Sequence, residues 1–375
     1  MIKKMKHIEQ LKSEILLLLG LGAFFLYAFH PPAADLKKEK AFEHYLHDSI
    51  PMQVDLVYDQ NNLPDHYYSY VRSPVCDDGL CKLVHIKLYW DLLGNFKDYE
   101  TPDGLPLTKF DHLEFTREDY LKLTSILADQ NSLLKDYEVD ELIDPDTEVV
   151  SETVDAVTGA TKETVKKAVV SGAVYSTYVI WHIVNGEVTA KMQEHTASTM
   201  NEPLLKKFML SDNHHYHYYA LDQLQQDDLT QLVYETGTML SQANVFVARN
   251  IINRLSEEAL ITEAWQLKLV ELYPDLEYQA QQLVLDRLKN VQLAASTLQN
   301  LAELLARQSA RQVETILTLM VKNEENLTKQ VLAAIAKLPY EMNPVLAEAG
   351  YEAILKLNKK NKDIKKAIKY YEQNY

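Results

Sequence analysis

The sequence NIINRL at residues 250–255 is followed by the related sequences VLDRL at 284–288 and AAIAKL at 333–338. Apolar residues recur with the period of a helix in the segments 227–240, 243–255, 259–272, 276–288, 291–308, 311–322, 326–338 and 342–357. The prolines of this part of the chain, Pro203, Pro274, Pro339 and Pro344, lie at or near the junctions between segments. We therefore expect residues 200–375 to form an all-α array of short helices joined by turns of a few residues.

The repeat is degenerate, and it resembles HEAT-type helical repeats. The resemblance implies a solenoid-like array in which each helical pair stacks on the next and exposes a long surface for partner proteins. A single irregular helical bundle is the competing interpretation of the same segments.

The first half of the chain has a different pattern. Aromatic and β-branched residues predominate from Met52 to Tyr58 and from Tyr67 to Tyr89, which favours strands. Turn residues predict a loop between Leu92 and His112, and Arg117–Leu127 has the apolar spacing of a helix that Thr116 opens. Residues 35–45 are charged and are interpreted as a stalk. These patterns predict an α+β domain over residues 45–195.

The chain has two cysteines, Cys76 and Cys81, which flank the turn sequence Asp77-Asp78-Gly79-Leu80. Strand-like residues on both sides, 68–75 and 83–90, indicate two strands joined by a tight turn. Cysteines that face each other across such a turn can form a disulfide, and in an exported protein this is the expected state. A metal or redox role is the alternative.

Residues 155–161, with the sequence DAVTGAT, are the strongest candidate for a binding site. Gly159 would allow a ligand to approach the backbone closely, and Thr158 and Thr161 supply hydroxyl groups. A small-residue stripe from Val165 to Ile183 predicts a long helix that starts near Lys162 and ends at Asn185-Gly186. The turn would then deliver the chain to a helix N-terminus, whose N–H groups and dipole favour a phosphate. Thr161 as an ordinary helix N-cap is the structural alternative.

This stretch resembles the FMN-binding domain found in the C subunit of the sodium-translocating NADH:quinone oxidoreductase, in the related electron-transport G subunit and in the nitrous-oxide reductase regulator. Asp155 through Thr161 match the core of that family, which joins an acidic residue to Ser/Thr-Gly-Ala-Thr, and an Ala/Val-rich segment follows. The resemblance implies FMN held at Asp155, Thr158, Gly159, Ala160, Thr161 and Thr164.

One position departs from the family. Glu163 stands where members often have a hydroxyl residue that takes part in covalent flavin attachment, and Thr164 follows it. A glutamate cannot form the phosphoester and would repel the phosphate. Attachment through Thr161, non-covalent FMN and a site that has decayed into structure therefore remain open.

The N-terminus carries a targeting signal. Lys3, Lys4 and Lys6 precede an unbroken apolar run from Ile15 to Phe29, and Ala33-Ala34 offers small residues for cleavage. Residues 1–34 are therefore interpreted as a signal sequence or an N-terminal membrane anchor, which predicts an extracytoplasmic, periplasmic location. The formal net charge of -16 argues against a nucleic-acid partner.

The remaining clusters give weaker predictions. Residues 89–94 and 107–112 combine aromatic and polar residues that could cover a flavin ring or simply pack in the core. His214 and His217 are spaced to share a helix face, but the chain lacks convincing further ligands beside them, so we expect no metal site. No catalytic pairing is evident. The sequence thus favours an FMN-binding module that relays electrons between envelope redox or membrane proteins, and a non-catalytic envelope scaffold is the alternative.

Overall fold

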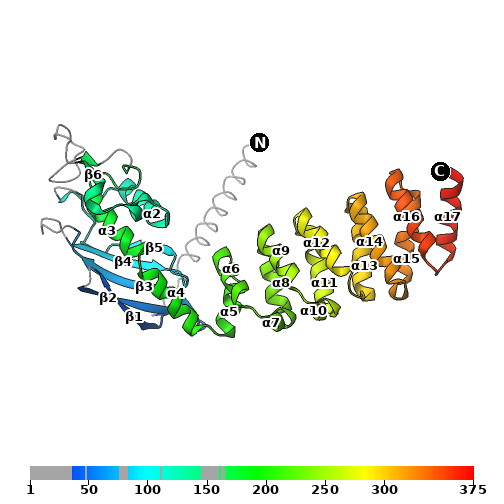
Figure 1. Cartoon of the computed structure of the whole chain (residues 1–375), viewed down its shortest axis with the longest axis horizontal. Coiled ribbons are helices and arrows are strands. Elements are labelled where there is room, and N and C mark those ends of the chain that lie inside the picture. The colour runs from blue at the N-terminus through cyan, green and yellow to red at the C-terminus, as the bar shows by residue number, and fades with distance from the viewer. Residues whose placement is uncertain (1–35, 47–48, 76–82, 110–111, 145–159, 162–164) are drawn as a thin grey trace, which may run out of the picture. The chain divides into compact units, whose positions relative to one another are not determined.

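A computed structural model describes residues 36–46, 49–75, 83–109, 112–144, 160–161 and 165–375 (Figure 1). The chain divides into two compact units, with the boundary between Met200 and Asn201. The first unit is α+β and the second is helical. The predicted order, an α+β part followed by a helical array, is therefore confirmed.

A five-stranded antiparallel sheet with the strand order β1-β2-β3-β4-β5 forms the centre of the first unit. Its strands are β1 (Lys38–Leu46), β2 (Ile50–Tyr58), β3 (Pro64–Ser73), β4 (Val84–Trp90) and β5 (Phe96–Glu100). The predicted strands near 52–58 and 67–89 are confirmed. The interpretation of residues 35–45 as a stalk is wrong, because β1 pairs with β2 from Lys38 to Leu46.

The expected loop between Leu92 and His112 is also partly wrong, since it contains β5. A turn at residues 91–95 returns the chain, and β5 then pairs with β4 from Phe96 to Glu100. The carboxylate of Asp91 holds this turn by accepting the backbone N–H groups of Leu93 and Asn95 at 2.8 and 2.9 Å. The polar residues at the start of the expected loop thus form a tight turn instead.

Helix α2 (Arg117–Ala128) is the helix predicted after Thr116. The Thr116 side chain accepts the N–H of Asp119, and the Asp119 carboxylate accepts the N–H of Thr116. This reciprocal capping box satisfies donors that have no partner within the helix. The short helices η2 (Leu133–Asp136) and η3 (Val139–Leu142) follow.

Helix α3 is shorter than predicted. It spans Val174–Asn185, and residues 165–173 form turns held by hydrogen bonds from Ala168 N to Val165 O and from Ala173 N to Val170 O. Gly172 has a φ of +75°, which interrupts any helix that would run through it. The prediction of a helix starting near Lys162 is therefore wrong, although its end at Asn185 is correct.

The sheet and the helices of the first unit share one core. Tyr67 of β3 is fully buried, and its hydroxyl donates to the carbonyl of Met192 in α4 (Val188–Thr199) at 3.1 Å. Trp90 of β4 is also fully buried, and its Nε1 donates to the carbonyl of Val184 in α3 at 2.9 Å. Helices α3 and α4 therefore cover one face of the sheet.

The second unit consists of helices alone. These are α5 (Glu202–Met209), α6 (His214–Gln223), α7 (Gln226–Gln231), α8 (Val233–Gln242), α9 (Val245–Arg254), α10 (Glu257–Ile261), α11 (Glu263–Leu272), η4 (Tyr273–Asp275), α12 (Tyr278–Leu288), α13 (Ala295–Leu304), η5 (Leu305–Arg307), α14 (Ala310–Lys322), η6 (Glu324–Asn326), α15 (Lys329–Ile335), η7 (Leu338–Tyr340), α16 (Pro344–Lys356) and α17 (Lys362–Asn374). The segments predicted between 227 and 357 correspond closely to α7–α16. The sequence patterns did not predict α4, α5 and α6.

The helices of this unit contact one another in two rows. One row is α5, α8, α11, α13, α15 and α17, and the other is α6, α9, α12, α14 and α16. Each helix contacts the next member of its own row, and Figure 1 shows them standing side by side in chain order. Buried leucine, isoleucine and valine side chains fill the space between the rows. The helical unit is thus built from successive two-helix layers.

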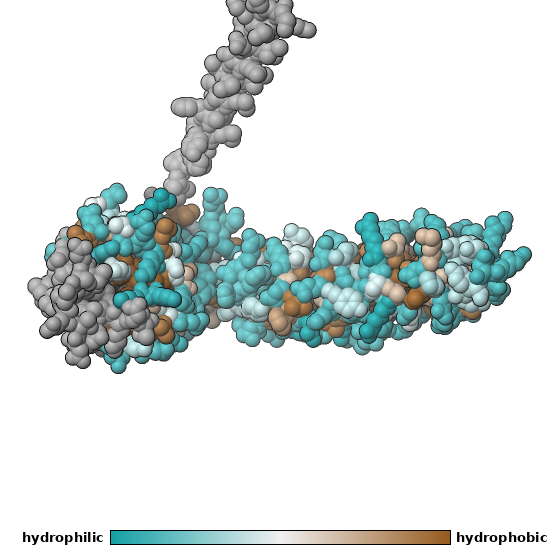
Figure 2. All heavy atoms as spheres, turned by 90° about the horizontal axis from the view of Figure 1, so that it is seen from above, coloured by the Kyte–Doolittle hydropathy of each residue, from teal (hydrophilic) through white to brown (hydrophobic). Residues whose placement is uncertain are grey.

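The surface of the helical unit is mostly polar on the face that Figure 2 shows. Hydrophilic residues cover most of that face, and hydrophobic residues gather there only in small patches. The apolar stripes of the helices are therefore used mainly in packing the layers together.

Candidate functional site

The predicted flavin-binding turn lies mostly outside the described residues, which exclude Asp155, Thr158, Gly159 and Thr164. Of its members, Ala160 and Thr161 are described as the two-residue strand β7. This strand pairs antiparallel with β6 (Ile143–Asp144), with Thr161 opposite Ile143.

The helix expected to supply a dipole at this turn does not begin there. Residues 165–173 are turns and α3 starts at Val174. Its N-cap, Ala173, provides no capping side chain. Thr161 therefore does not open a helix, and the phosphate site expected at this turn stays a prediction.

The other predicted sites have simpler outcomes. Cys76 and Cys81 lie outside the described residues, while the strands that flank them pair as expected, with Ser73 opposite Val84. Trp90 is fully buried, which supports the packing interpretation of residues 89–94, whereas Phe110, the aromatic residue of 107–112, lies outside the described residues.

Of the histidines at the start of α6, His217 belongs to the helical core, whereas His214 and His215 are exposed. His217 is buried, its Nε2 lies 2.6 Å from the carbonyl oxygen of Ser211, and burial lowers its pKa. A neutral imidazole that donates to a carbonyl is the state this environment favours. Among the described side chains, no group of three or more His, Cys, Asp or Glu residues is arranged to hold a metal ion.

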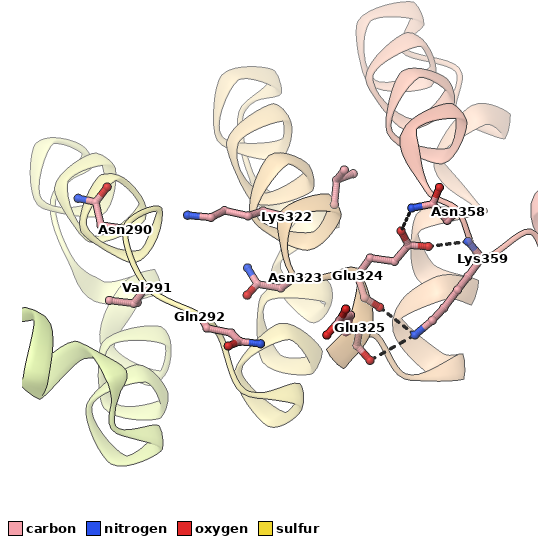
Figure 3. A pocket seen from close by; sticks show the side chains of 10 residues that line it. Asn290, Val291, Gln292, Lys322, Asn323, Glu324, Glu325, Asn358 and Lys359 are labelled. Atoms are coloured by element: carbon pink, nitrogen blue, oxygen red, sulfur yellow. Dashed lines mark hydrogen bonds between the residues drawn. The ribbon is translucent and has the colours of Figure 1, made fainter.

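The helical unit presents a groove of about 750 Å³ across three successive turns that connect its layers. These turns follow α12, α14 and α16, and Figure 3 shows them side by side. The lining residues are Asn290, Val291, Gln292, Val321, Lys322, Asn323, Glu324, Glu325, Asn358 and Lys359. Sequence reasoning missed this groove.

Basic side chains connect each turn to the one before it. Arg254 donates to the carbonyls of Leu221 and Leu224, Arg287 to the carbonyl of Leu255, and Lys322 to the carbonyl of Lys289. Each accepting carbonyl lies at the C-terminal end of a helix in the second row, where carbonyls lack helical partners. Each cation also meets the negative end of the helix dipole. The same physical interaction is therefore repeated from layer to layer.

Lys359 continues this series at the end of the groove. Its Nζ donates to the carbonyls of Glu324 and Glu325 at 3.1 and 3.2 Å (Figure 3). The Glu324 carboxylate accepts the Asn358 amide at 2.9 Å and the Lys359 backbone N–H. Partial burial acts to raise the pKa of Glu324, but these hydrogen bonds dominate and lower it. Glu324 is thus held ionised between two turns.

Carboxamides fix the first turn of the groove from both sides. Gln266 of α11 donates to the carbonyl of Gln292 at 2.9 Å and accepts the N–H of Ala294 at 2.8 Å. From the following layer, Asn323 accepts the N–H of Leu293 at 2.8 Å and Asn326 donates to its carbonyl at 2.8 Å. The backbone of residues 292–294 is therefore held rigidly.

The spacing of these residues is the signal that could have revealed the groove. Arg254 and Arg287 are 33 positions apart, as are Asn290 and Asn323. The apolar patterns alone do not show which residues join the layers. A search for polar residues at this fixed spacing would have found them.

Three groove side chains make no hydrogen bond within the described part of the chain: Asn290, Gln292 and Glu325. They offer two carboxamides and one carboxylate above a fixed backbone. This arrangement is suited to binding. No protein-family model matches this chain, and no curated protein and no solved structure matches it either.

Within the described ranges, no helix combines the length and the apolar character that a membrane crossing requires. The predicted signal or anchor at residues 1–34 lies outside those ranges.

Proposed function

We propose that the second unit is a HEAT-like solenoid that binds a partner protein, and that the groove over residues 290–292, 321–325 and 358–359 takes an extended segment of that partner. The observation that carries this proposal is the repeated connection of each turn to the one before it. A series of equivalent turns presents polar groups at regular intervals, and an extended chain offers its own backbone groups at regular intervals.

Rigidity supports the same function. Gln266, Asn323 and Asn326 hold the first turn, and Glu324, Asn358 and Lys359 hold the second against the third. A surface that is already ordered loses little conformational entropy when a ligand binds, so more of the interaction energy appears as affinity. Carboxamides such as Asn290 and Gln292 can both donate to and accept from a peptide backbone.

Charge indicates the kind of segment that fits. The ammonium groups of Lys322 and Lys359 are each engaged by main-chain carbonyls, while the Glu325 carboxylate is unpaired among the described residues. The chain as a whole carries a formal net charge of -16. A segment with at least one Lys or Arg side chain is therefore the complementary ligand.

The proposed location rests on the signal sequence or membrane anchor expected at residues 1–34. Such a segment would direct the protein to the extracytoplasmic envelope, so the proposed partners are envelope redox or membrane proteins.

The binding function is tested by selecting peptides from a displayed random library on the full-length protein. We expect selected peptides to be enriched in Lys or Arg, and Glu325→Arg to weaken their binding by about tenfold or more. Glu314→Arg is the matched control, because this exposed carboxylate lies on α14 away from the groove lining. Equal affinity for the two variants would show that the peptides bind elsewhere.

A second candidate function is a non-catalytic FMN carrier that relays electrons. The resemblance of Asp155 through Thr161 to the FMN-binding family supports it. Both functions are compatible in one chain, since one would use the first unit and the other the second.

The flavin candidate is tested by the absorbance of protein exported from cells able to flavinylate, before and after acid precipitation. Flavin in the precipitate would indicate covalent attachment, and flavin in the supernatant would indicate non-covalent FMN. Gly159→Val should abolish flavin retention by blocking the backbone approach. A colourless protein that takes up no added FMN would leave the scaffold function alone.

A further inference from the structure

The first unit contains a separate hollow of about 420 Å³, which falls within the range of roughly 300–1,000 Å³ that is usual for small-molecule sites. Four segments form its walls: the turn after β4, the loop and η2 after α2, the end of α3, and α4. Its lining includes five carboxamides and one charged side chain: Asn95, Gln130, Asn131, Asn185, Gln193 and Lys135. No carboxylate of the described residues lines it, although the chain is strongly acidic.

The orientation of two of these carboxamides follows from their partners. Asn185 donates its Nδ2 to the carbonyl of Leu127 at 3.1 Å, and Gln193 donates its Nε2 to the carbonyl of Leu93 at 3.0 Å. A main-chain carbonyl can only accept, so the amide nitrogen must face it. The amide oxygens of Asn185 and Gln193 are therefore directed away from these contacts.

A chain of three residues fixes Gln130 in the same way. The Asp91 carboxylate accepts from Asn95 Nδ2 at 2.9 Å, so the Asn95 Oδ1 is free to accept from Gln130 Nε2, also at 2.9 Å. An ionised carboxylate has no proton to donate, which determines the direction of both hydrogen bonds. The amide oxygen of Gln130 is thus left as an acceptor.

Lys135 is the charged side chain among the described residues of the lining. His182 lies 3.0 Å through its Nε2 from the carbonyl of Leu134, and burial lowers its pKa, so the ring is neutral at neutral pH. Trp181 is almost fully buried and donates to the carbonyl of Asp129 at 2.9 Å. Lys135 is exposed and makes no hydrogen bond within the described part of the chain.

We infer that this hollow binds a neutral polyhydroxylated ligand the size of a mono- or disaccharide. The oxygens of Gln130, Asn185 and Gln193 are available as acceptors, while the remaining amide hydrogens and the Lys135 ammonium are available as donors. A hydroxyl group both donates and accepts, so a sugar can use the two kinds of group together. An anion has no hydrogen to donate to the three oxygens, and a cation would meet Lys135 without a carboxylate to balance it. The inference is independent of the proposed function, because it concerns the other unit.

Ligand-observed saturation-transfer NMR on the full-length protein tests this inference, with D-glucose, D-galactose, N-acetyl-D-glucosamine and maltose as separate probes. We expect saturation transfer to at least one sugar. Replacing both Gln130 and Gln193 with leucine should weaken its binding by about tenfold or more, because several hydrogen bonds are lost. Both side chains are exposed, so the double variant should fold. Gln373→Leu, on the exposed end of α17, is the matched control.

Three results would overturn the inference. The first is that none of the sugars shows saturable transfer, and the second is that the double variant leaves the transfer unchanged. The third is displacement of the bound sugar by sodium sulfate, which would identify a site for anions directed by Lys135.

Discussion

Replacing Gln266 with leucine tests how the layers of the helical unit are joined. Gln266 is 1% exposed, and its carboxamide donates to the carbonyls of Leu260 and Gln292, both at 2.9 Å. It also accepts from the N–H of Ala294 and, at 3.1 Å, from the hydroxyl of Thr297. One side chain thus connects its own layer to the turn of the next.

The expected loss follows from the groups that the substitution leaves without partners. Each buried polar group that loses its partner costs about 1–3 kcal/mol. Thr297 is fully buried, whereas Gln292 is exposed and its carbonyl can turn to water. We therefore expect Gln266→Leu to lower the free energy of unfolding by about 2–4 kcal/mol, less than the sum over its hydrogen bonds.

Urea unfolding followed by far-UV circular dichroism measures this loss, because the second unit is wholly helical. Hydrogen exchange should accelerate at the amides of Leu293 and Ala294. Gln282→Leu is the control, since the buried Nε2 of Gln282 has no hydrogen-bond partner among the described residues, and its replacement should be neutral or stabilising. A loss below about 1 kcal/mol for Gln266→Leu, or equal effects of the two variants, would refute the reasoning.

Three further predictions concern the first unit. Gly94→Ala should destabilise it by about 1–3 kcal/mol in thermal unfolding, because φ is +77° and a Cβ would lie 2.9 Å from the Thr189 carbonyl oxygen. Gly104→Ala is the control, because Gly104 has a similar φ of +74° but no atom near the added Cβ, so it should destabilise the unit less. Equal losses of stability would show that the close approach to Thr189 contributes nothing. Thr116→Ala should cost about 0.5–2 kcal/mol in the same assay through loss of the α2 cap, and an unchanged unfolding temperature would contradict it. Burial lowers the pKa of His182 below its unfolded value of about 6.5, so the unfolded chain binds the proton more readily. The free energy of unfolding should therefore fall as pH decreases through about 6.5, and urea unfolding at several pH values should show a shallower fall for His182→Gln. Parallel profiles for the two proteins would contradict this prediction.

The elements with strong local patterns could be predicted from the sequence. The spacing of Thr116 and Asp119 is that of a capping box and indicates the start of α2. The alternation of apolar and polar residues from Val84 to Trp90 indicates the strand β4. Helices α7–α16 were predictable because each buries one apolar stripe. Their arrangement in two rows depends on contacts between segments distant in the sequence, which periodicity does not report.

The errors in the fold have local causes as well. The small-residue stripe from Val165 to Ile183 has helical period, but Gly172 adopts a left-handed conformation that divides it. The Asn185-Gly186 pair does end α3, yet Gly186 has a φ of −83° and is not left-handed. The space there is limited instead, because a Cβ would overlap the carbonyl oxygen of His182.

The sites were harder to predict than the fold. The groove depends on which carbonyls Arg287, Lys322 and Lys359 reach, and these lie about 30–35 residues away in the chain. The hollow proposed to bind a sugar combines four segments whose carboxamides look ordinary in the sequence. Composition suggests polar loops at these positions, while only the hydrogen-bond partners show which amide oxygens remain available.

Site-specific photo-crosslinking in living cells tests the central claim most directly. A photoreactive residue at Gln292, inside the groove, should capture a defined partner through a segment that contains Lys or Arg, whereas the same residue at Gln373 should not. Capture at Gln292 should also decrease when Glu325 is changed to arginine. Equal capture at both positions, or capture at Gln292 that Glu325→Arg leaves unchanged, would contradict the account of the groove as the site for the partner.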